Sequence, residues 1–322
     1  MSKRTLLTLA AASALLLPAV AWAQGAYPDR PIRLVVGYTP GGSNDIVARI
    51  IAPPLGEALG TSVVVENRPG ASGAIGADHV AKSPPDGYTL LAASASPVVI
   101  TPHTLPKIAF NTLTDFAPVN TVGLTPEAVA VGPKLKVGSL RELLDRARTQ
   151  PVSFSSSGNG GLPHLTIELL TQASRGRILH VPYKGAAAAI SDTLAGHVDG
   201  IVMDLPPLFP LIHDGRLKAL AVTSAERFDL LPDLPTAREE LPGFTVTNWM
   251  GVFAPAKTPR AVVERLDAAL KKVVAREDVK AQLLKNAVVP SVMASPDAFQ
   301  HFVAEEFHRW GRLVKEKNIT SD

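Results

Sequence analysis

The stretch Tyr38-Thr39-Pro40-Gly41-Gly42-Ser43-Asn44-Asp45 decides the fold. It follows an apolar run at residues 32–36 and precedes an apolar-periodic segment that opens at Ile46, which predicts a strand, a glycine turn and a helix N-terminus. The glycines allow a sharp turn and a close ligand, and Ser43 or Asn44 is expected to cap the helix. The free N–H groups of the first turn suit a carboxylate, phosphate or sulfate. Taken alone, the stretch fits an ordinary strand–helix connection equally well.

The first residues predict export. Lys3 and Arg4 precede a run of mostly Leu and Ala from Leu6 to Val20, and Ala21-Trp22-Ala23 follows with small residues at the two positions that matter for cleavage. We interpret residues 1–23 as a secretory signal peptide that is cleaved after Ala23, which places the mature chain in the periplasm. A retained membrane anchor is the alternative, but the run is short for a span and ends at a cleavage site.

Composition excludes several classes of function. Without the predicted signal peptide the chain carries 30 basic and 29 acidic residues, and this balance argues against a nucleic-acid partner. The chain has no cysteine, which excludes disulfides, iron–sulfur clusters and thiol catalysis. A mature length of about 300 residues fits one large domain or two of average size.

Strand and helix patterns alternate along most of the chain, which predicts an α/β fold built on mainly parallel sheets. Two interruptions stand out. Pro53-Pro54 predicts a kink or break in the first helix before Leu55, and residues 98–123 read as irregular. Beyond the first strand, strands are expected at 63–66, 88–93, 127–131, 178–181, 198–203, 217–223 and 246–253, and a further one opens at Val152.

The second half of the chain repeats the chemistry of the opening stretch. Residues 152–164 read as a strand, a Ser/Gly loop and a helix that begins near Pro163. Ligands of open parallel sheets bind at such loops, beyond the carboxyl ends of the strands. Two anion-suited helix termini, one in each half, predict a cleft that closes on a small anion.

The sequence lacks the common motifs of catalytic sites. The Gly-x-Ser-x-Gly elbow and the phosphate-loop pattern are absent, and Pro163 occupies the third glycine position of a dinucleotide fingerprint. The histidines lack metal-binding spacing. We therefore predict a protein that is not an enzyme and uses no cofactor or metal. The alternative is an exported α/β enzyme that acts on a small organic acid, with His164 and Asp204 as acid and base.

Eight stretches carry a family resemblance and run through the mature chain in order. They are YPDRPIRLVV at 27–36, PGGSNDIVAR at 40–49, VENRPGA at 65–71, PDGYTLL at 85–91, SGNG at 157–160 with His164, HVPYKG at 180–185, LKALAVT at 217–223 and LPDLPT at 231–236. In these stretches the sequence is similar to the tripartite tricarboxylate transporter receptor family, the Bug extracytoplasmic solute-binding proteins.

The resemblance implies a type II periplasmic binding fold, in which crossing strands join two α/β domains around a central cleft. Domain 1 is expected at 24–123 plus 246–322, and domain 2 at 124–245. Members of the family bind small carboxylates, largely through main-chain groups and bridging waters, and deliver them to a membrane permease. A monomeric receptor of this kind is expected here. Another reading is a receptor that feeds a membrane sensor kinase.

The resemblance also implies the ligand contacts. Carried over by position, those of the first domain are Tyr38, Pro40, Gly41, Gly42, Asn44, Asp45, Ser94 and Ala95. Those of the second domain are Ser156, Ser157, Gly158, Asn159, His164, Tyr183 and Asp204. Three of these side chains have other readings: Asp45 as a complement to the helix dipole, Asp204 as a turn cap, and Tyr183 as a packing residue. Lys184 is expected to face solvent.

Overall fold

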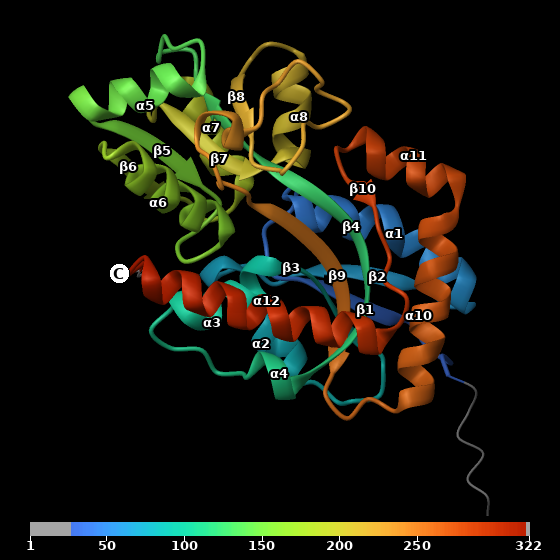
Figure 1. Ribbon diagram of the computed structural model, residues 1–322. Helices are drawn as coiled ribbons and strands as arrows, with labels where there is room; N and C mark the ends of the chain where they lie inside the picture. Colours follow the sequence, from blue (N-terminus) through green and yellow to red (C-terminus); the bar gives the residue numbers. More distant parts are fainter. Residues whose placement is uncertain (1–26, 320–322) are drawn as a thin grey trace, which may run out of the picture.

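The computed structural model describes residues 27–319, and the predicted signal peptide therefore lies outside the described residues. The chain forms two α/β lobes, one above the other in Figure 1. The first lobe holds β1 to β3 and the second lobe holds β5 to β8, and β4 and β9 run side by side between them. The predicted α/β class is confirmed.

The strands are β1 (Ile32–Val36), β2 (Val63–Asn67), β3 (Thr89–Ser94), β4 (Phe116–Val131), β5 (Val152–Ser156), β6 (Ile178–Pro182), β7 (Gly200–Asp204), β8 (Lys218–Val222), β9 (Thr247–Pro255) and β10 (Val289–Pro290). The helices are α1 (Ser43–Leu59), α2 (Ala74–Ala81), α3 (Thr101–Thr104), α4 (Thr112–Asp115), α5 (Leu140–Thr149), α6 (Leu162–Ser174), α7 (Ala186–Ala195), α8 (Leu205–His213), α9 (Ala237–Glu240), α10 (Arg260–Ala275), α11 (Glu277–Lys285) and α12 (Pro296–Glu316).

The strands lie in the order β2-β1-β3-β9-β4-β7-β5-β6, and β8 and β10 also pair with β4. Parallel pairing joins β1 to β2 and β3 in the first lobe, and β5 to β6 and β7 in the second. Strand β9 pairs antiparallel with β3 and β4, and β4 also pairs antiparallel with β7, β8 and β10. Parallel pairing is thus confirmed for the outer strands, whereas the centre is antiparallel because the chain leaves the first lobe in β4 and returns in β9.

Strand β4 belongs to both lobes. Its residues 116–126 pair with β9, and its residues 127–131 pair with β7 and β8. The expectation of irregular structure at 98–123 is wrong here, because β4 already begins at Phe116. The prolines of this segment had indicated irregular structure. Pro118, however, lies beside a register shift in the β4–β9 pairing, a place where a strand tolerates proline. The predicted domain boundaries stay a prediction.

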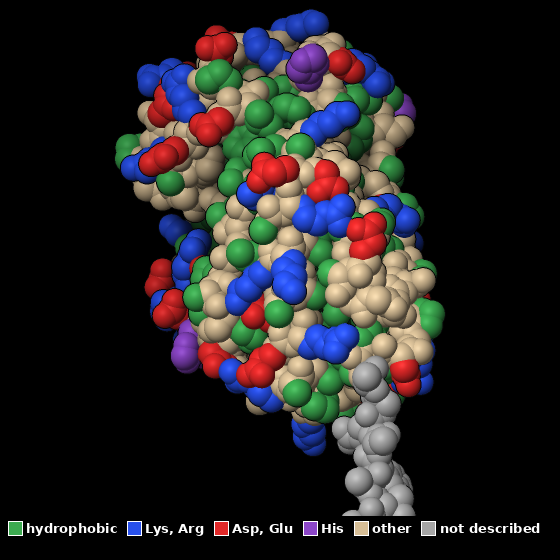
Figure 2. Space-filling view, turned by 90° about the vertical axis from the view of Figure 1, so that its right-hand side faces the viewer, with side chains coloured by type: hydrophobic (Ala, Val, Ile, Leu, Met, Phe, Trp, Pro, Cys, Tyr) green, Lys and Arg blue, Asp and Glu red, His purple; other side chains and the backbone are tan. Residues whose placement is uncertain are grey.

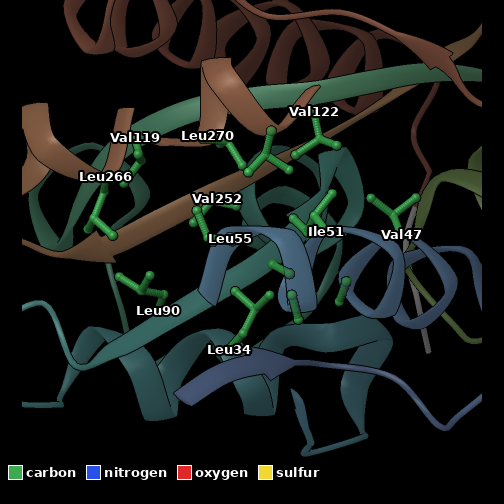
Figure 3. Close-up of a cluster of buried hydrophobic side chains, with 14 of the residues drawn as sticks. Leu34, Val47, Ile51, Leu55, Leu90, Val119, Val122, Val252, Leu266 and Leu270 are labelled. Atoms are coloured by element: carbon green, nitrogen blue, oxygen red, sulfur yellow. The ribbon is translucent and has the colours of Figure 1, made fainter. Parts of the chain in front are cut away.

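Each lobe buries both faces of its sheet. In the first lobe α1 and α10 pack over one face of the sheet. Val47, Ile51 and Leu55, which the sequence placed on one face of α1, point toward the strands (Figure 3). Helices α2 and α12 contribute to the core on the other face. In the second lobe α5 and α6 contribute to one core and α7 and α8 to the other. No helix within residues 27–319 has both the length and the apolar character for crossing a bilayer.

Helix α1 runs without interruption through Pro53 and Pro54, so of the predicted kink or break the break is wrong, and the kink stays a prediction. The two prolines remove the donors to the carbonyls of Arg49 and Ile50. Arg49 is exposed and Ile50 half-buried, so this side of the helix is open to water, while Ile51 and its buried neighbours hold the helix against the sheet.

Surface charge is mixed on the face that Figure 2 shows. Lys and Arg side chains alternate there with Asp and Glu over both lobes. Exposed ion pairs of the described residues include Arg260–Asp297 and Arg276–Glu57. Such exposed pairs contribute little to stability, so the buried cores and the crossing strands hold the fold together.

Candidate functional site

A cavity of about 520 Å³ lies between the two lobes. Four loops that follow the parallel strands β1, β2, β5 and β6 supply its walls, together with Leu105, as expected for an open sheet that binds at the carboxyl ends of its strands. The lining residues are Gly37, Tyr38, Thr39, Pro69, Gly70, Ala71, Ser72, Gly73, Leu105, Ser157, Gly158, Asn159, Pro182, Tyr183, Lys184 and Gly185.

Five of the predicted contacts line this cavity, namely Tyr38, Ser157, Gly158, Asn159 and Tyr183. Lys184, which was expected to face solvent, is exposed and also lines it. The other predicted contacts lie outside the lining set and stay predictions: Pro40, Gly41, Gly42, Asn44, Asp45, Ser94, Ala95, Ser156, His164 and Asp204.

Asp45 holds the glycine turn in place. Its Oδ2 accepts hydrogen bonds from the Gly41 N–H (2.9 Å) and from Arg49 Nε (2.9 Å), and its Oδ1 accepts one from Asn67 Nδ2 (2.8 Å). Burial works to raise the pKa of Asp45, but these donors hold it below its ordinary value. The Gly41 amide is therefore engaged by the protein itself, and Asp45 positions the turn.

The cap of α1 differs from the prediction. Gly42 is the N-cap residue, and no side chain caps the helix. Ser43 and Asn44 are buried in the first turn, where Asn44 Nδ2 donates to Ser94 Oγ (3.2 Å). The predicted contacts Asn44 and Ser94 therefore touch each other, and their contact with a ligand stays a prediction.

The loops meet across the cavity in two pairs. The turn after β1 faces the turn after β6: a Cβ built on Gly185 would overlap Thr39 Oγ1, and one built on Gly42 would lie 3.9 Å from the Ala186 Cβ. The loop after β2 faces the loop after β5, where Ser72 Oγ donates to the Asn159 carbonyl (2.6 Å). The N-termini of α1 and α6, the two helix starts that follow glycines, therefore do not face each other directly.

The loop after β2 is the main part of the wall that was not predicted. Ala71 and Ser72 have φ values of 48° and 49°, a left-handed conformation that costs side-chain-bearing residues about 1 kcal/mol or more each. The surroundings impose it: Tyr38 OH donates to the Ser72 carbonyl (2.7 Å) while the Ser72 hydroxyl reaches Asn159. Its glycine-rich composition directly after a parallel strand was the signal that could have identified it.

Further bonds join the lobes at the start of α6. The Leu162 N–H donates to Ser96 Oγ (2.9 Å), and Thr104 Oγ1 donates to the Gly160 carbonyl (2.6 Å). Ser96 and Thr104 belong to the first lobe, and Gly160 and Leu162 to the second. One amide at this helix N-terminus is thus used for contact between lobes, which leaves the anion-binding role of the terminus a prediction.

His164 and His180 support the loop after β5. The rings stack with centroids 4.0 Å apart, and His164 Nδ1 accepts a hydrogen bond from the Gly160 N–H (3.1 Å). Ser156 Oγ lies 2.6 Å from His180 Nε2. Burial, and then the neighbouring His164, lower the pKa of His180 to about 3, so this ring is neutral at physiological pH. His164 and Ser156 therefore shape the loop from behind the wall.

Two carboxyl groups are buried together behind the cavity. Glu127 of β4 lies opposite Asp204 of β7 in the strand register. Thr166 Oγ1 donates to Glu127 Oε2, and Asn248 Nδ2 donates to Asp204 Oδ1 (2.9 Å). Burial raises the pKa of both groups, and the charge of Asp204 raises that of Glu127 further. Glu127 was not predicted, although an acid in an otherwise apolar strand was a signal.

Asn248 connects this pair to the first lobe. Its Oδ1 accepts a hydrogen bond from the Ala95 N–H (3.2 Å), so the predicted contacts Ala95 and Asp204 meet through Asn248 of β9. Burial raises the pKa of Tyr38 on the cavity wall, and the charges of Asp204 and Glu127 raise it further. Within residues 27–319 no hydrogen bond joins His164 to Asp204, the acid and base of the enzyme alternative.

Comparisons with known proteins agree with this architecture. The model of a family described as "Tripartite tricarboxylate transporter family receptor" matches residues 47–319. Protein BugT of Bordetella pertussis is 37% identical over 294 residues, which cover 90% of this chain and 90% of that protein.

Two solved structures are similar over nearly their whole length. An R. palustris protein solved with adipate has 34% identity and a TM-score of 0.88, covering 91% of this chain and 99% of that one. MatC from Rhodopseudomonas palustris, with bound malate, has 29% identity and a TM-score of 0.84, covering 89% and 100%. The fold is thus the two-domain fold of periplasmic binding proteins, and the chain belongs to the tripartite tricarboxylate transporter receptor family, whose members are solute-binding receptors.

Proposed function

We propose that this protein is a periplasmic receptor that captures a small carboxylate between its lobes and delivers it to a membrane permease without transforming it. One observation carries the proposal: both lobes supply the cavity wall, and Lys184 is the one charged residue among those that line it. Among the residues that the structure describes, no carboxylate lines the cavity to repel an anion. The neighbours solved with adipate and with malate support the same class of ligand.

Closure of the lobes on the ligand is expected because each lobe supplies part of the cavity wall. A ligand that touches loops of both lobes stabilises their closed arrangement in proportion to its greater affinity for it. The Ser72–Asn159 bond and the contact of Thr39 with the turn at Gly185 exist only when the lobes are together. A permease that recognises the closed arrangement therefore receives loaded receptors.

Calorimetric titration of the mature protein with mono-, di- and tricarboxylates tests the proposal. A ligand at a hundred times its dissociation constant should add about 2.7 kcal/mol to the free energy of unfolding. If no acid in a broad panel binds, the receptor proposal is wrong, and turnover of a bound acid by the pure protein would favour the enzyme. Delivery is tested separately, by uptake of the bound acid into cells with and without the gene for this chain.

Lys184→Gln should weaken the binding of any carboxylate by about two- to fivefold at low ionic strength, because an exposed charge pair contributes only modestly. The difference should shrink as salt is added. Lys136→Gln makes the same charge change on an exposed residue of the second lobe outside the lining set, and should leave affinity unchanged. Equal effects of the two variants would show that Lys184 acts only through net charge.

Ser72→Ala should raise the dissociation constant by about fivefold, since it removes one hydrogen bond between the lobes, a loss of about 1 kcal/mol. Ser83→Ala is the matched control, because Ser83 Oγ donates to the His79 carbonyl (2.8 Å) inside the first lobe. Titration of both variants with the same acid measures the difference. An unchanged affinity in Ser72→Ala would mean that the Ser72–Asn159 bond does not contribute to closure.

A further inference from the structure

We infer that the cavity selects a carboxylate with an apolar body over a polyhydroxylated acid of the same length and charge. The inference rests on the proposed function and specifies the chemistry of its ligand. It is based on the side chains of the cavity wall that lie beside the ligand's body, apart from the groups that attract its carboxylate.

Much of the wall is apolar. Leu105, Pro69 and Ala71 line it from the first lobe, and Pro182 lines it from the second. Leu105 is half-buried, and it packs against the apolar core under α12. This part of the wall offers no side-chain donor or acceptor to a ligand.

The tyrosines add ring surface, since their hydroxyls are already bonded. Tyr38 OH donates to the Ser72 carbonyl (2.7 Å), and Tyr183 OH donates to Asp192 Oδ2 (2.7 Å). The Ser72 hydroxyl likewise donates its proton to the Asn159 carbonyl. Three of the hydroxyl groups on the wall have therefore given their proton to the protein, and they offer a ligand only acceptor lone pairs.

Few polar side chains remain to bond the hydroxyls of a polyhydroxylated acid. The other polar side chains on the wall are those of Thr39, Ser157, Asn159 and Lys184. A hydroxyl that leaves water for an apolar wall loses its hydrogen bonds, whereas a methylene at the same place gains from burial. For a ligand that differs by several hydroxyls we expect affinity to differ by about tenfold to a hundredfold.

Matched pairs of acids test the inference on the unmodified mature protein. Adipate and galactarate share six carbons and two carboxylates and differ by four hydroxyls; cyclohexanecarboxylate and quinate form a second pair with one carboxylate. Calorimetry should show the member without hydroxyls binding about tenfold or more tightly in each pair that binds. Equal or tighter binding of the hydroxylated members overturns the inference and leaves the receptor proposal standing. If no member of either pair and no other carboxylate binds, both fail.

A variant locates the selectivity on the wall. Leu105→Asn puts an amide of similar size beside the ligand, and should reduce the ratio of affinities within a pair several-fold. Leu230→Asn is the control, since Leu230 is 40% exposed and lies outside the lining set. An unchanged ratio in a folded Leu105→Asn protein removes Leu105 from the selecting wall, and the wild-type ratios still decide the inference.

Discussion

Gly185→Ala should weaken ligand binding by about tenfold to a hundredfold, the equivalent of an overpacking cost of about 1–3 kcal/mol. A Cβ at this position would overlap Thr39 Oγ1 and lie 3.2 Å from the Thr39 Cβ. Thr39 belongs to the first lobe and Gly185 to the second, so the added methyl group disfavours the closed arrangement and leaves the open one alone. Calorimetric titration with a carboxylate that binds the wild type measures the loss.

The control is a glycine that also has a positive φ but has no neighbour for a Cβ to clash with. Gly185 has a φ of 108°, which an alanine adopts with difficulty, and Gly215 has a φ of 68° with nothing within 4 Å of its Cβ position. Gly215→Ala should therefore cost some stability and keep its affinity. If both variants lose affinity equally, strain rather than the clash between lobes explains the result. If Gly185→Ala binds as tightly as the wild type, this pair of loops does not close on the ligand.

Glu127→Gln should make the protein more stable at pH 8 and less sensitive to pH. The pKa values of Glu127 and Asp204 lie above their ordinary values of 4.5 and 3.8, so above about pH 4 the folded state binds more protons than the unfolded state. Their contribution to stability is complete below the ordinary values and declines as pH rises through the raised ones. Each proton involved contributes a slope of up to about 1.4 kcal/mol per pH unit.

Urea denaturation of wild type and variant between pH 4 and pH 8 measures this, and the difference between the two proteins is the diagnostic quantity. His180 acts in the opposite direction, because its lowered pKa of about 3 makes stability rise toward its ordinary value of 6.5. This term cancels in the difference. Glu264→Gln, at an exposed residue paired with Arg260, should follow the wild type. A difference that does not grow with pH would mean that Glu127 is not held protonated.

The parts of the fold that depend on local pattern were predicted from the sequence. The apolar period of 46–59 predicted α1, and the Ser/Gly loop before Pro163 predicted the start of α6, since side chains three and four residues apart share a helix face. The break at Pro53 was wrong because burial of Ile51 and Leu55 outweighs two missing hydrogen bonds. Tertiary packing therefore keeps α1 continuous, and a local sequence pattern contains no information about that packing.

The predicted ligand contacts stay predictions, and only some of them line the cavity. The family resemblance implied Tyr38 and Ser157, which line it, but which loop faces which depends on how the lobes meet. That arrangement brought Ser72 to Asn159, 87 positions along the chain, and left Asp45 and His164 supporting turns. The sequence shows Glu127 as an unusual acid in its strand. That Glu127 lies opposite Asp204 follows only from the strand register.

The adjacent, antiparallel strands β4 and β9 determine how the lobes can move. Their ladder of hydrogen bonds runs along β4 from Phe116 to Pro126, and sliding one strand along the other would break all of its bonds at once. A two-stranded ribbon of this kind resists stretching and shear but bends and twists easily, the more so at its two register shifts. We therefore expect the lobes to bend about β4 and β9 without sliding past each other, so that on closing the same loops would meet the same partners.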